Sequence, residues 1–147
     1  MPSSFLEKDE VYYLAGKMSG IPKFNFPRFM TVARWLRDAG YNIMNPAEID
    51  DEHTRAQSIA SEHGDLGDTD MTWGEALGRD VTIVADKCDA VILMDEWWES
   101  KGAMLEAFTA CLLNKPLYEL NGGRDGSPLY LHIANKEAVL AIMKGRV

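Results

Sequence analysis

The chain has 147 residues, of which 46% are hydrophobic, and this is enough apolar material to bury a core without cross-links. Its formal net charge of -8 argues against a protein that binds the phosphate backbone of a nucleic-acid polymer, because such a protein needs a basic face to displace counterions. We therefore expect one domain over residues 1–147, with no nucleic-acid polymer as partner. A small ligand in a local pocket remains compatible with this charge.

Neither the cysteines nor the first residues indicate secretion or a membrane. Cys88 and Cys111 lie in apolar surroundings without Cys-x-x-Cys or Cys/His spacing, which favours reduced core residues of a cytoplasmic protein. Residues 1–10 lack the basic and apolar regions of a secretory leader, and no run of 18 apolar residues occurs. The histidines have no metal-ligand spacing, and DLGDTD (65–70) only loosely resembles a calcium loop. We expect no metal, no cofactor and no membrane partner.

The first part of the chain predicts a strand, a loop, a helix and a second strand. VYYLAG (11–16) is a β-rich run that ends in glycine, and the next residues have the Gly, Ser and Pro content of a loop. A helix is expected from Asn25, as N-cap, to Gly40, as terminator. YNIMNP (41–46) is the second strand, which ends at its proline.

An acidic segment follows, from Ala47 to Met71. Between Glu48 and Asp70 the sequence has eight acidic residues and one basic residue, Arg55. The segment has no clear hydrophobic period and contains two glycines, so we predict a loop insertion over 47–71, with a short helix near 56–62 as an option.

The remainder alternates helices with strands. Thr72 and Glu75 form a T-x-x-E capping box that opens a helix reaching about Lys87. AVILM (90–94) is a continuous apolar run, typical of a central parallel strand. After it we predict a helix that starts at Ser100, a strand over 116–120, a loop over 121–128, an edge strand over 129–132, and a helix capped by Asn135.

This alternation predicts an α/β fold with three layers. Its centre is a mostly parallel four- to five-stranded sheet, covered by helices on both faces, in a Rossmann- or flavodoxin-like arrangement. Ligands of such sheets bind beyond the carboxyl ends of the strands. The loops after residues 11–16, 41–46 and 90–94 are therefore expected to line any site.

Glu106 is a single carboxylate in an otherwise apolar helix. From Gly102 to Leu113 the other residues are Gly, Ala, Met, Leu, Phe, Thr or Cys, so most of the helix circumference is expected to be packed. The residues one turn away from Glu106 are mostly small, which leaves space beside the carboxylate. We expect Glu106 to be partly buried next to a cavity; the alternative is a narrow polar stripe that faces water.

The start of the same helix is a candidate anion site. Ser100 is expected to cap the helix, so that its hydroxyl and the amides of residues 101–103, Gly102 included, face whatever lies there. An ordinary cap without a ligand is the alternative. Roughly 9 Å of helix rise separates Ser100 from Glu106, which suits a molecule with an anion at one end and a reacting carbon at the other.

Further candidates are Asp80, Tyr13 and Trp97. Asp80 lies on the core-facing stripe of its helix, although a surface position beside Arg79 is an alternative. Tyr13 ends the first strand, as a catalytic phenol or as a packed aromatic. Trp97 and Trp98 either form a lid over a planar base or cover the sheet edge. Two carboxylates beside a small pocket suit glycosyl chemistry, in which one attacks the anomeric carbon and the other handles the proton of the leaving group.

Four stretches, YLAGKMSGIPKFNFPRF, GYNIMNPAE, RDVTIVADKCDAVILM and ESKGAMLEAFTA, together resemble the nucleoside 2-deoxyribosyltransferase-like superfamily, in particular its small branch from bacteriophages and prophages. The resemblance extends from about Val11 to Leu120. It implies that Glu106, at the end of S-x-G-x-x-x-E, is the nucleophile that attacks C1′. It also implies that Asp80 helps to protonate the leaving base and that Tyr13 positions the sugar and the nucleophile.

The first residue of this motif implies the substrate. Members of the superfamily that cleave deoxynucleoside 5′-monophosphates carry a serine there, with its hydroxyl on the phosphate, whereas transferases of free nucleosides carry an aspartate. Ser100 is therefore similar to the monophosphate hydrolases. Gly16, Lys17 and Ser19 are further candidate phosphate contacts, although the hydrolases place a serine directly after the glycine. The resemblance also implies homodimers or larger homo-oligomers.

The sequence thus predicts a cytoplasmic N-glycosidase that releases the free base from a 2′-deoxynucleoside 5′-monophosphate. Base exchange between deoxynucleosides is the nearest alternative. A nucleotide-binding sensor that has kept the pocket without the reaction is a second alternative, and cleavage of a larger dinucleotide is a third.

Overall fold

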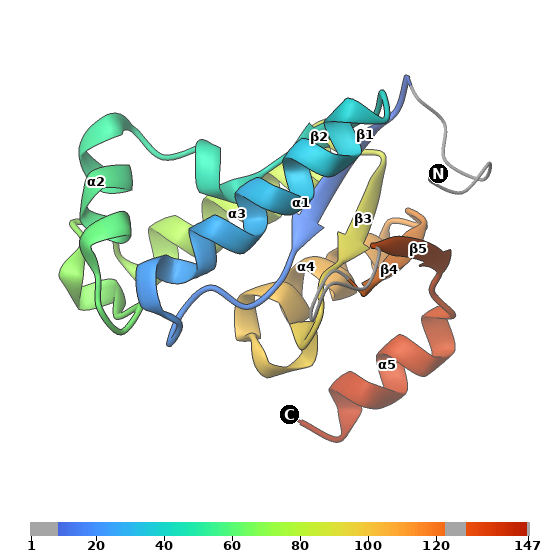
Figure 1. The fold of residues 1–147 in the computed structure, drawn as a ribbon. Helices are drawn as coiled ribbons and strands as arrows, with labels where there is room; N and C mark the ends of the chain where they lie inside the picture. The colour runs from blue at the N-terminus through green and yellow to red at the C-terminus, as the bar shows by residue number, and fades with distance from the viewer. Residues whose placement is uncertain (1–8, 123–128, 147) are drawn as a thin grey trace.

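A computed structural model describes residues 9–122 and 129–146 (Figure 1). Its centre is a five-stranded sheet with the order β2-β1-β3-β4-β5, in which β5 is antiparallel to β4 and the other pairs are parallel. The strands span Val11–Ala15 (β1), Asn42–Met44 (β2), Ala90–Leu93 (β3), Leu117–Asn121 (β4) and Tyr130–Ile133 (β5). The predicted α/β class with a mostly parallel sheet is confirmed.

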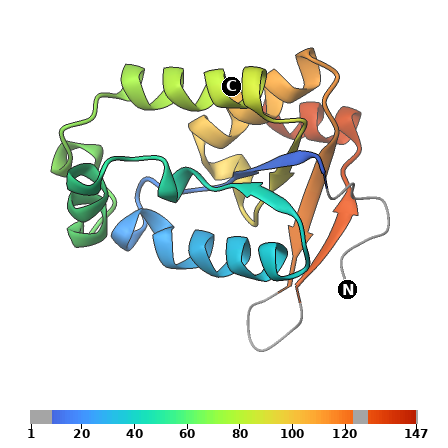
Figure 2. The same ribbon diagram turned by 90° about the horizontal axis from the view of Figure 1, so that it is seen from above.

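Helices cover both faces of the sheet, so the molecule has three layers. Figure 2 shows α1 on one face and α3, α4 and α5 on the other. The helices span Phe26–Asp38 (α1), Glu52–Ala60 (α2), Trp73–Lys87 (α3), Lys101–Leu112 (α4) and Lys136–Lys144 (α5). Within the described residues, no helix combines the length and the apolar character needed to cross a bilayer.

The alternation of side chains along β1 produces two apolar layers. Tyr12 and Leu14 pack with the apolar residues of α1, whereas Tyr13 and Ala15 pack with those of α3, α4 and α5. All four side chains are buried. Because β1 and β3 are covered on both faces, they read in the sequence as continuous apolar runs.

Most predicted helix starts have the predicted capping contacts. The hydroxyl of Thr72 accepts from the Glu75 N–H at 3.1 Å, and the Glu75 carboxylate accepts from the Thr72 N–H at 3.2 Å. Asn135 Oδ1 accepts from the Ala138 N–H at 3.1 Å. Asn25 does precede α1, but its side chain donates to the carbonyl of Lys17 at 3.0 Å and does not cap the helix. Of the predicted loop over 121–128, residues 123–128 lie outside the described residues.

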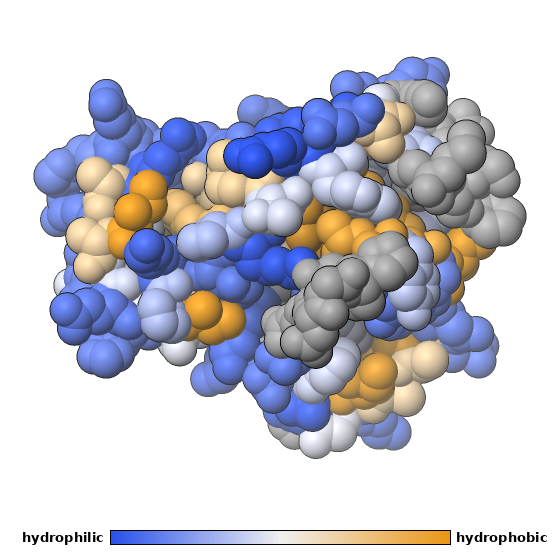
Figure 3. Space-filling view, in the orientation of Figure 1, coloured by the Kyte–Doolittle hydropathy of each residue, from blue (hydrophilic) through white to orange (hydrophobic). Residues whose placement is uncertain are grey.

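The acidic segment is more ordered than predicted. It contains α2, which starts at Glu52, whereas the optional short helix was placed near 56–62. Asp51 caps α2, because its Oδ1 accepts from the Thr54 N–H at 2.8 Å. One capping aspartate among many acidic residues is hard to recognise in a sequence, and this explains the error. The outer face at the α2 end of the molecule is mostly hydrophilic, with a few apolar side chains between (Figure 3).

Backbone hydrogen bonds join the acidic segment to the loop after β1. The Gly20 N–H donates to the Gly64 carbonyl at 2.9 Å, and the Lys23 N–H donates to the Ser61 carbonyl at 2.8 Å. Gly64 has φ +66°, and a Cβ there would lie 2.3 Å from the carbonyl oxygen of Ile21. Only glycine fits this position, so the two segments pack backbone to backbone and form one wall.

We expect Gly64→Ala to lower the free energy of unfolding by roughly 1–3 kcal/mol or more, because the left-handed backbone is strained for alanine and the added methyl group clashes. Gly78→Ala is the control, since Gly78 is exposed in α3 and a Cβ there meets no heavy atom within 4 Å. This control should raise the free energy of unfolding by about 0.5–1 kcal/mol. Urea denaturation measures both, and equal stabilities for the two variants would contradict the packing described.

Candidate active site

A cavity of about 330 Å³ lies beyond the carboxyl ends of β1 and β3. The two strands are neighbours, but the helices that follow them, α1 and α4, lie on opposite faces of the sheet. The cavity therefore occupies the topological switch point, where ligands of open α/β sheets bind. Its volume is within the range of small-molecule sites.

The cavity brings together most of the predicted site residues. Those that line it are Tyr13, Gly16, Ser19, Asp80, Ser100, Gly102 and Glu106. Because they come from β1, the first loop, α3 and α4, the fold collects at one place residues that are up to 93 positions apart in the chain.

Glu106 is buried and hydrogen bonded to the first strand. Its side chain is 6% exposed, and the Tyr13 hydroxyl donates to its Oε2 at 2.6 Å. Small residues of α4, among them Ala103 and Ala107, pack in the same apolar cluster as Tyr13 and bring the helix close to β1. The expected burial of Glu106 is confirmed, and the alternative of a water-facing stripe is excluded.

The surroundings of Glu106 and Tyr13 raise the pKa of both side chains. Burial raises the pKa of Glu106 well above its ordinary value, and the nearby charge of Asp80 raises it further. The hydrogen bond from Tyr13 and the charge of Arg79 act in the opposite direction. Burial, with the charge of Glu106, also raises the pKa of the Tyr13 phenol, so Tyr13 keeps its proton and remains a donor at neutral pH.

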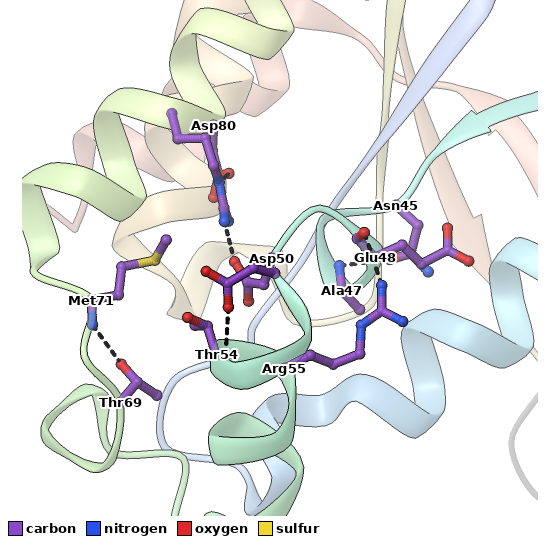
Figure 4. A network of polar contacts seen from close by, with 11 residues as sticks. Asn45, Ala47, Glu48, Asp50, Thr54, Arg55, Thr69, Met71 and Asp80 are labelled. Atoms are coloured by element: carbon purple, nitrogen blue, oxygen red, sulfur yellow. Dashed lines mark hydrogen bonds and ion pairs between the residues drawn. The ribbon is translucent and has the colours of Figure 1, made fainter.

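Asp80 and Asp50 share one arginine at the cavity wall. Arg79 Nε donates to Asp80 Oδ1 at 2.9 Å, and Arg79 Nη1 donates to Asp50 Oδ1. Figure 4 shows Asp80, from α3, and Asp50, just before α2, pointing toward one another. Asp80 thus has the arginine partner of the surface alternative, but it also lines the cavity. Burial raises the pKa of Asp80, and Arg79 opposes this shift.

Ser100 and Gly102 form the start of α4 at the cavity. Ser100 Oγ accepts from the Ala103 N–H at 3.1 Å, which confirms the predicted cap, and its O–H remains able to donate to a ligand. A Cβ at Gly102 would be 3.6 Å from the nearest atom of Leu77, an ordinary contact. Packing therefore does not require glycine at 102, and its absent side chain leaves room in the cavity. At Gly16, by contrast, a Cβ would lie 2.9 Å from Met94 Cβ, so glycine is needed for packing.

Lys17 and Trp97 are the two predicted site residues outside the cavity lining. Lys17 Nζ pairs with Glu99 Oε2 at 3.1 Å, and Glu99 does line the cavity. Trp97 is 1% exposed and belongs to the apolar cluster of β1, β3 and α4, with its ring at right angles to Trp98. The residues after β3 turn this indole into the core, which agrees with the packing alternative and not with a lid.

Several residues of the cavity lining were not predicted from the sequence. These are Asp50, Arg79 and the aromatic residues Phe24, Phe26 and Trp73. Asp50 is one of many acidic residues in a segment without a period, so no local signal separates it from the solvated ones. Within the described residues, no three His, Cys, Asp or Glu side chains come together as a metal site.

A second, more open hollow adjoins the cavity, with a volume of about 630 Å³. The two spaces share lining residues from the first loop, the acidic segment and the start of α3. These are Ser19, Leu66, Thr69, Met71 and Trp73. The acidic segment thus borders both the cavity and the hollow beside it.

The fold and the cavity are those of a Rossmann-like α/β protein with a carboxylate-lined pocket at the switch point of its sheet. Residues 10–118 match the family described as Domain of unknown function (DUF4406). The match covers well over half of the chain, so the protein belongs to this family. Neither a curated protein nor a solved structure matches the chain significantly.

The raised pKa of Glu106 has a consequence for stability. A carboxyl group whose pKa is higher in the folded than in the unfolded state stabilises the fold below its unfolded pKa, and this contribution is lost as the pH rises toward the folded pKa. Glu106→Gln removes the titration and keeps the shape. We expect Glu106→Gln to be more stable than the wild type near pH 8, with the difference shrinking toward pH 4. Urea denaturation at the two pH values measures this, and a difference that is independent of pH would argue against a strained buried carboxyl.

Proposed function

We propose that the protein is an N-glycosidase that cleaves a 2′-deoxynucleoside 5′-monophosphate and releases the free base. The observation that carries the proposal is the buried carboxylate of Glu106, held by Tyr13 at the cavity. A carboxylate that is poorly solvated and fixed by one donor can attack an electrophilic carbon without first losing a shell of water.

The proposed reaction proceeds in two steps. A Glu106 oxygen bonds to C1′ as the bond from C1′ to the base nitrogen breaks, and the bonding electrons leave with the base. The base takes a proton from Asp80 as it departs. Water then adds to C1′, the ester bond to Glu106 breaks, and the proton of the water passes to the Asp80 carboxylate.

The ionisation of Glu106 and the protonation of Asp80 set the acid and alkaline limits of the proposed reaction. Glu106 must be ionised to attack, and because its pKa is raised, activity falls on the acid side at a higher pH than an ordinary glutamate would cause. Asp80 must carry a proton, and burial raises its pKa in the useful direction. Tyr13 favours the ionised form of Glu106 and so keeps the nucleophile usable.

The start of α4 is the proposed phosphate site. Ser100 and Ser19 supply hydroxyl groups there, Lys101 supplies a positive charge, and all three line the cavity. The first amides of α4 add the positive end of the helix dipole. Lys17 lies outside the lining, so its part in the proposal is to neutralise the charge of Glu99, which does line the cavity.

The proposal includes self-association, which the resemblance implies, and a cytoplasmic location, which the two cysteines in apolar surroundings favour. Apolar side chains along α4, Leu105, Phe108, Leu112 and Leu113, are each more than a third exposed, which supports an interface between copies of the chain. The mass of the protein in solution, measured by light scattering, tests this part on its own.

Glu106→Ala should abolish base release, with a loss of roughly a thousandfold or more, because no other group is placed to form the ester. With a 2′-fluorinated nucleotide, which slows hydrolysis of the intermediate, intact-mass spectrometry should show the wild-type chain with one sugar phosphate attached, and peptide mapping should locate it on Glu106. Glu62→Gln, an exposed change in the acidic segment, is the control with full activity. New nucleosides formed from an added free base, without net base release, would identify a transferase instead.

Ser100→Asp tests the phosphate site without removing the helix cap, since aspartate is also a good N-cap. A carboxylate about 4 Å from a phosphate costs about 4 kcal/mol at an effective dielectric of 20. We therefore expect kcat/KM for the monophosphate to fall by roughly 100-fold or more, with little loss for the free deoxynucleoside. Equal losses for both substrates would place the phosphate elsewhere.

A further inference from the structure

Arg79 lies between two carboxylates, and the proposed reaction uses only one of them. Its guanidinium donates to Asp80 through Nε and to Asp50 through Nη1. The side chains of Asp50 and Asp80 are 8% and 17% exposed, so both pairs are shielded from solvent. Asp50 lies between a short 3-10 helix, Pro46–Glu48, and Asp51, the N-cap of α2.

A general acid next to a lone arginine would be a poor acid, because the positive charge favours the ionised form of the carboxyl. Burial is the main cause that raises the pKa of Asp80, and the negative charge of Asp50, which is paired with the same arginine, adds to this rise and offsets part of the effect of Arg79. The other ionisable groups that face Asp80 are Glu106 from α4 and Tyr13 from β1. Arg79 can thus orient Asp80 without holding it permanently ionised.

We propose that Asp50 is a positioning residue for proton transfer to the leaving base, acting through Arg79 on Asp80. This inference rests on the proposed function. In the transfer, the O–H bond of Asp80 breaks, an N–H bond forms on the base, and the electrons of the glycosidic bond stay with the base. Asp80 is left as a carboxylate, which Arg79 stabilises at that moment. Asp50 lines the cavity, but its carboxylate is engaged by Arg79, so its part in the reaction is to position Asp80.

The decisive measurement compares leaving groups. Single-turnover base release is measured for the wild type and Asp50→Asn with the deoxynucleotide that the wild type cleaves. It is repeated with an activated form of the same base, methylated at N7 for a purine or fluorinated at C5 for a pyrimidine. An activated base departs with less help from an acid. We expect Asp50→Asn to slow the ordinary substrate by roughly 10- to 100-fold, part of the 10²–10⁴-fold that a general acid contributes, and to leave the activated substrate close to the wild-type rate.

Two further readouts separate this role from a general structural one. KM should change little, since the Asp50 carboxylate is engaged by Arg79. The alkaline limb of the pH profile should move to lower pH in Asp50→Asn, because Asp80 then faces Arg79 without the opposing charge and loses its proton more readily. Asp70→Asn removes the same charge from an exposed residue of the acidic segment that pairs with His53, and it should behave as the wild type.

Equal slowing of both substrates by Asp50→Asn, or no slowing, would overturn the inference. Should Asp50→Asn fail to fold, Asp50→Glu is the variant that decides, because it keeps the charge and changes the geometry. A smaller loss of rate that is confined to the ordinary base supports the inference. Equal losses for both substrates, or no loss, overturn it. A wild type that releases no base from any deoxynucleotide refutes the proposed function itself. If the wild type does release base and the Asp50 variants slow the ordinary and the activated substrate equally, only the role of Asp50 is refuted.

Discussion

The hydrogen bond from Tyr13 to Glu106 is the contact on which the site depends. It joins β1 to the middle of α4, and it requires that helix to lie close to the sheet. The small residues of α4 are therefore needed for the contact with Tyr13 as well as for packing. Ala103 and Ala107 are buried against the same cluster, so a larger residue at either position would not fit without moving the helix.

Local patterns predicted those parts of the molecule that depend on local physics. The apolar runs of β1 and β3 reflect strands covered on both faces, and the capping box at Thr72 fixes the start of α3 within the chain itself. The burial of Glu106 could also be predicted, because its neighbours on α4 are almost all apolar. Each of these features depends on contacts between residues close together in the chain or on the composition of a single helix or strand.

The pairing of Arg79 with Asp50 could not be predicted in this way, since the two residues are 29 positions apart and belong to segments with no shared pattern. The start of α2 was missed because its cap is one acidic residue among many. Trp97 was open to two interpretations, because an indole after a strand can turn toward the ligand or toward the core. Only the path of the backbone between β3 and α4 decides which.

The wall formed by the first loop and the acidic segment is joined through main-chain amides and carbonyls. Such bonds are indifferent to the identity of most side chains around them. Thr54 and Met71, whose side chains line the cavity from this wall, can therefore be exchanged while these main-chain bonds stay in place. Under the proposed function, the fold keeps the group of Tyr13, Asp80 and Glu106 apart from a wall whose side chains can change, so that related chains could accept different molecules around the same carboxylates.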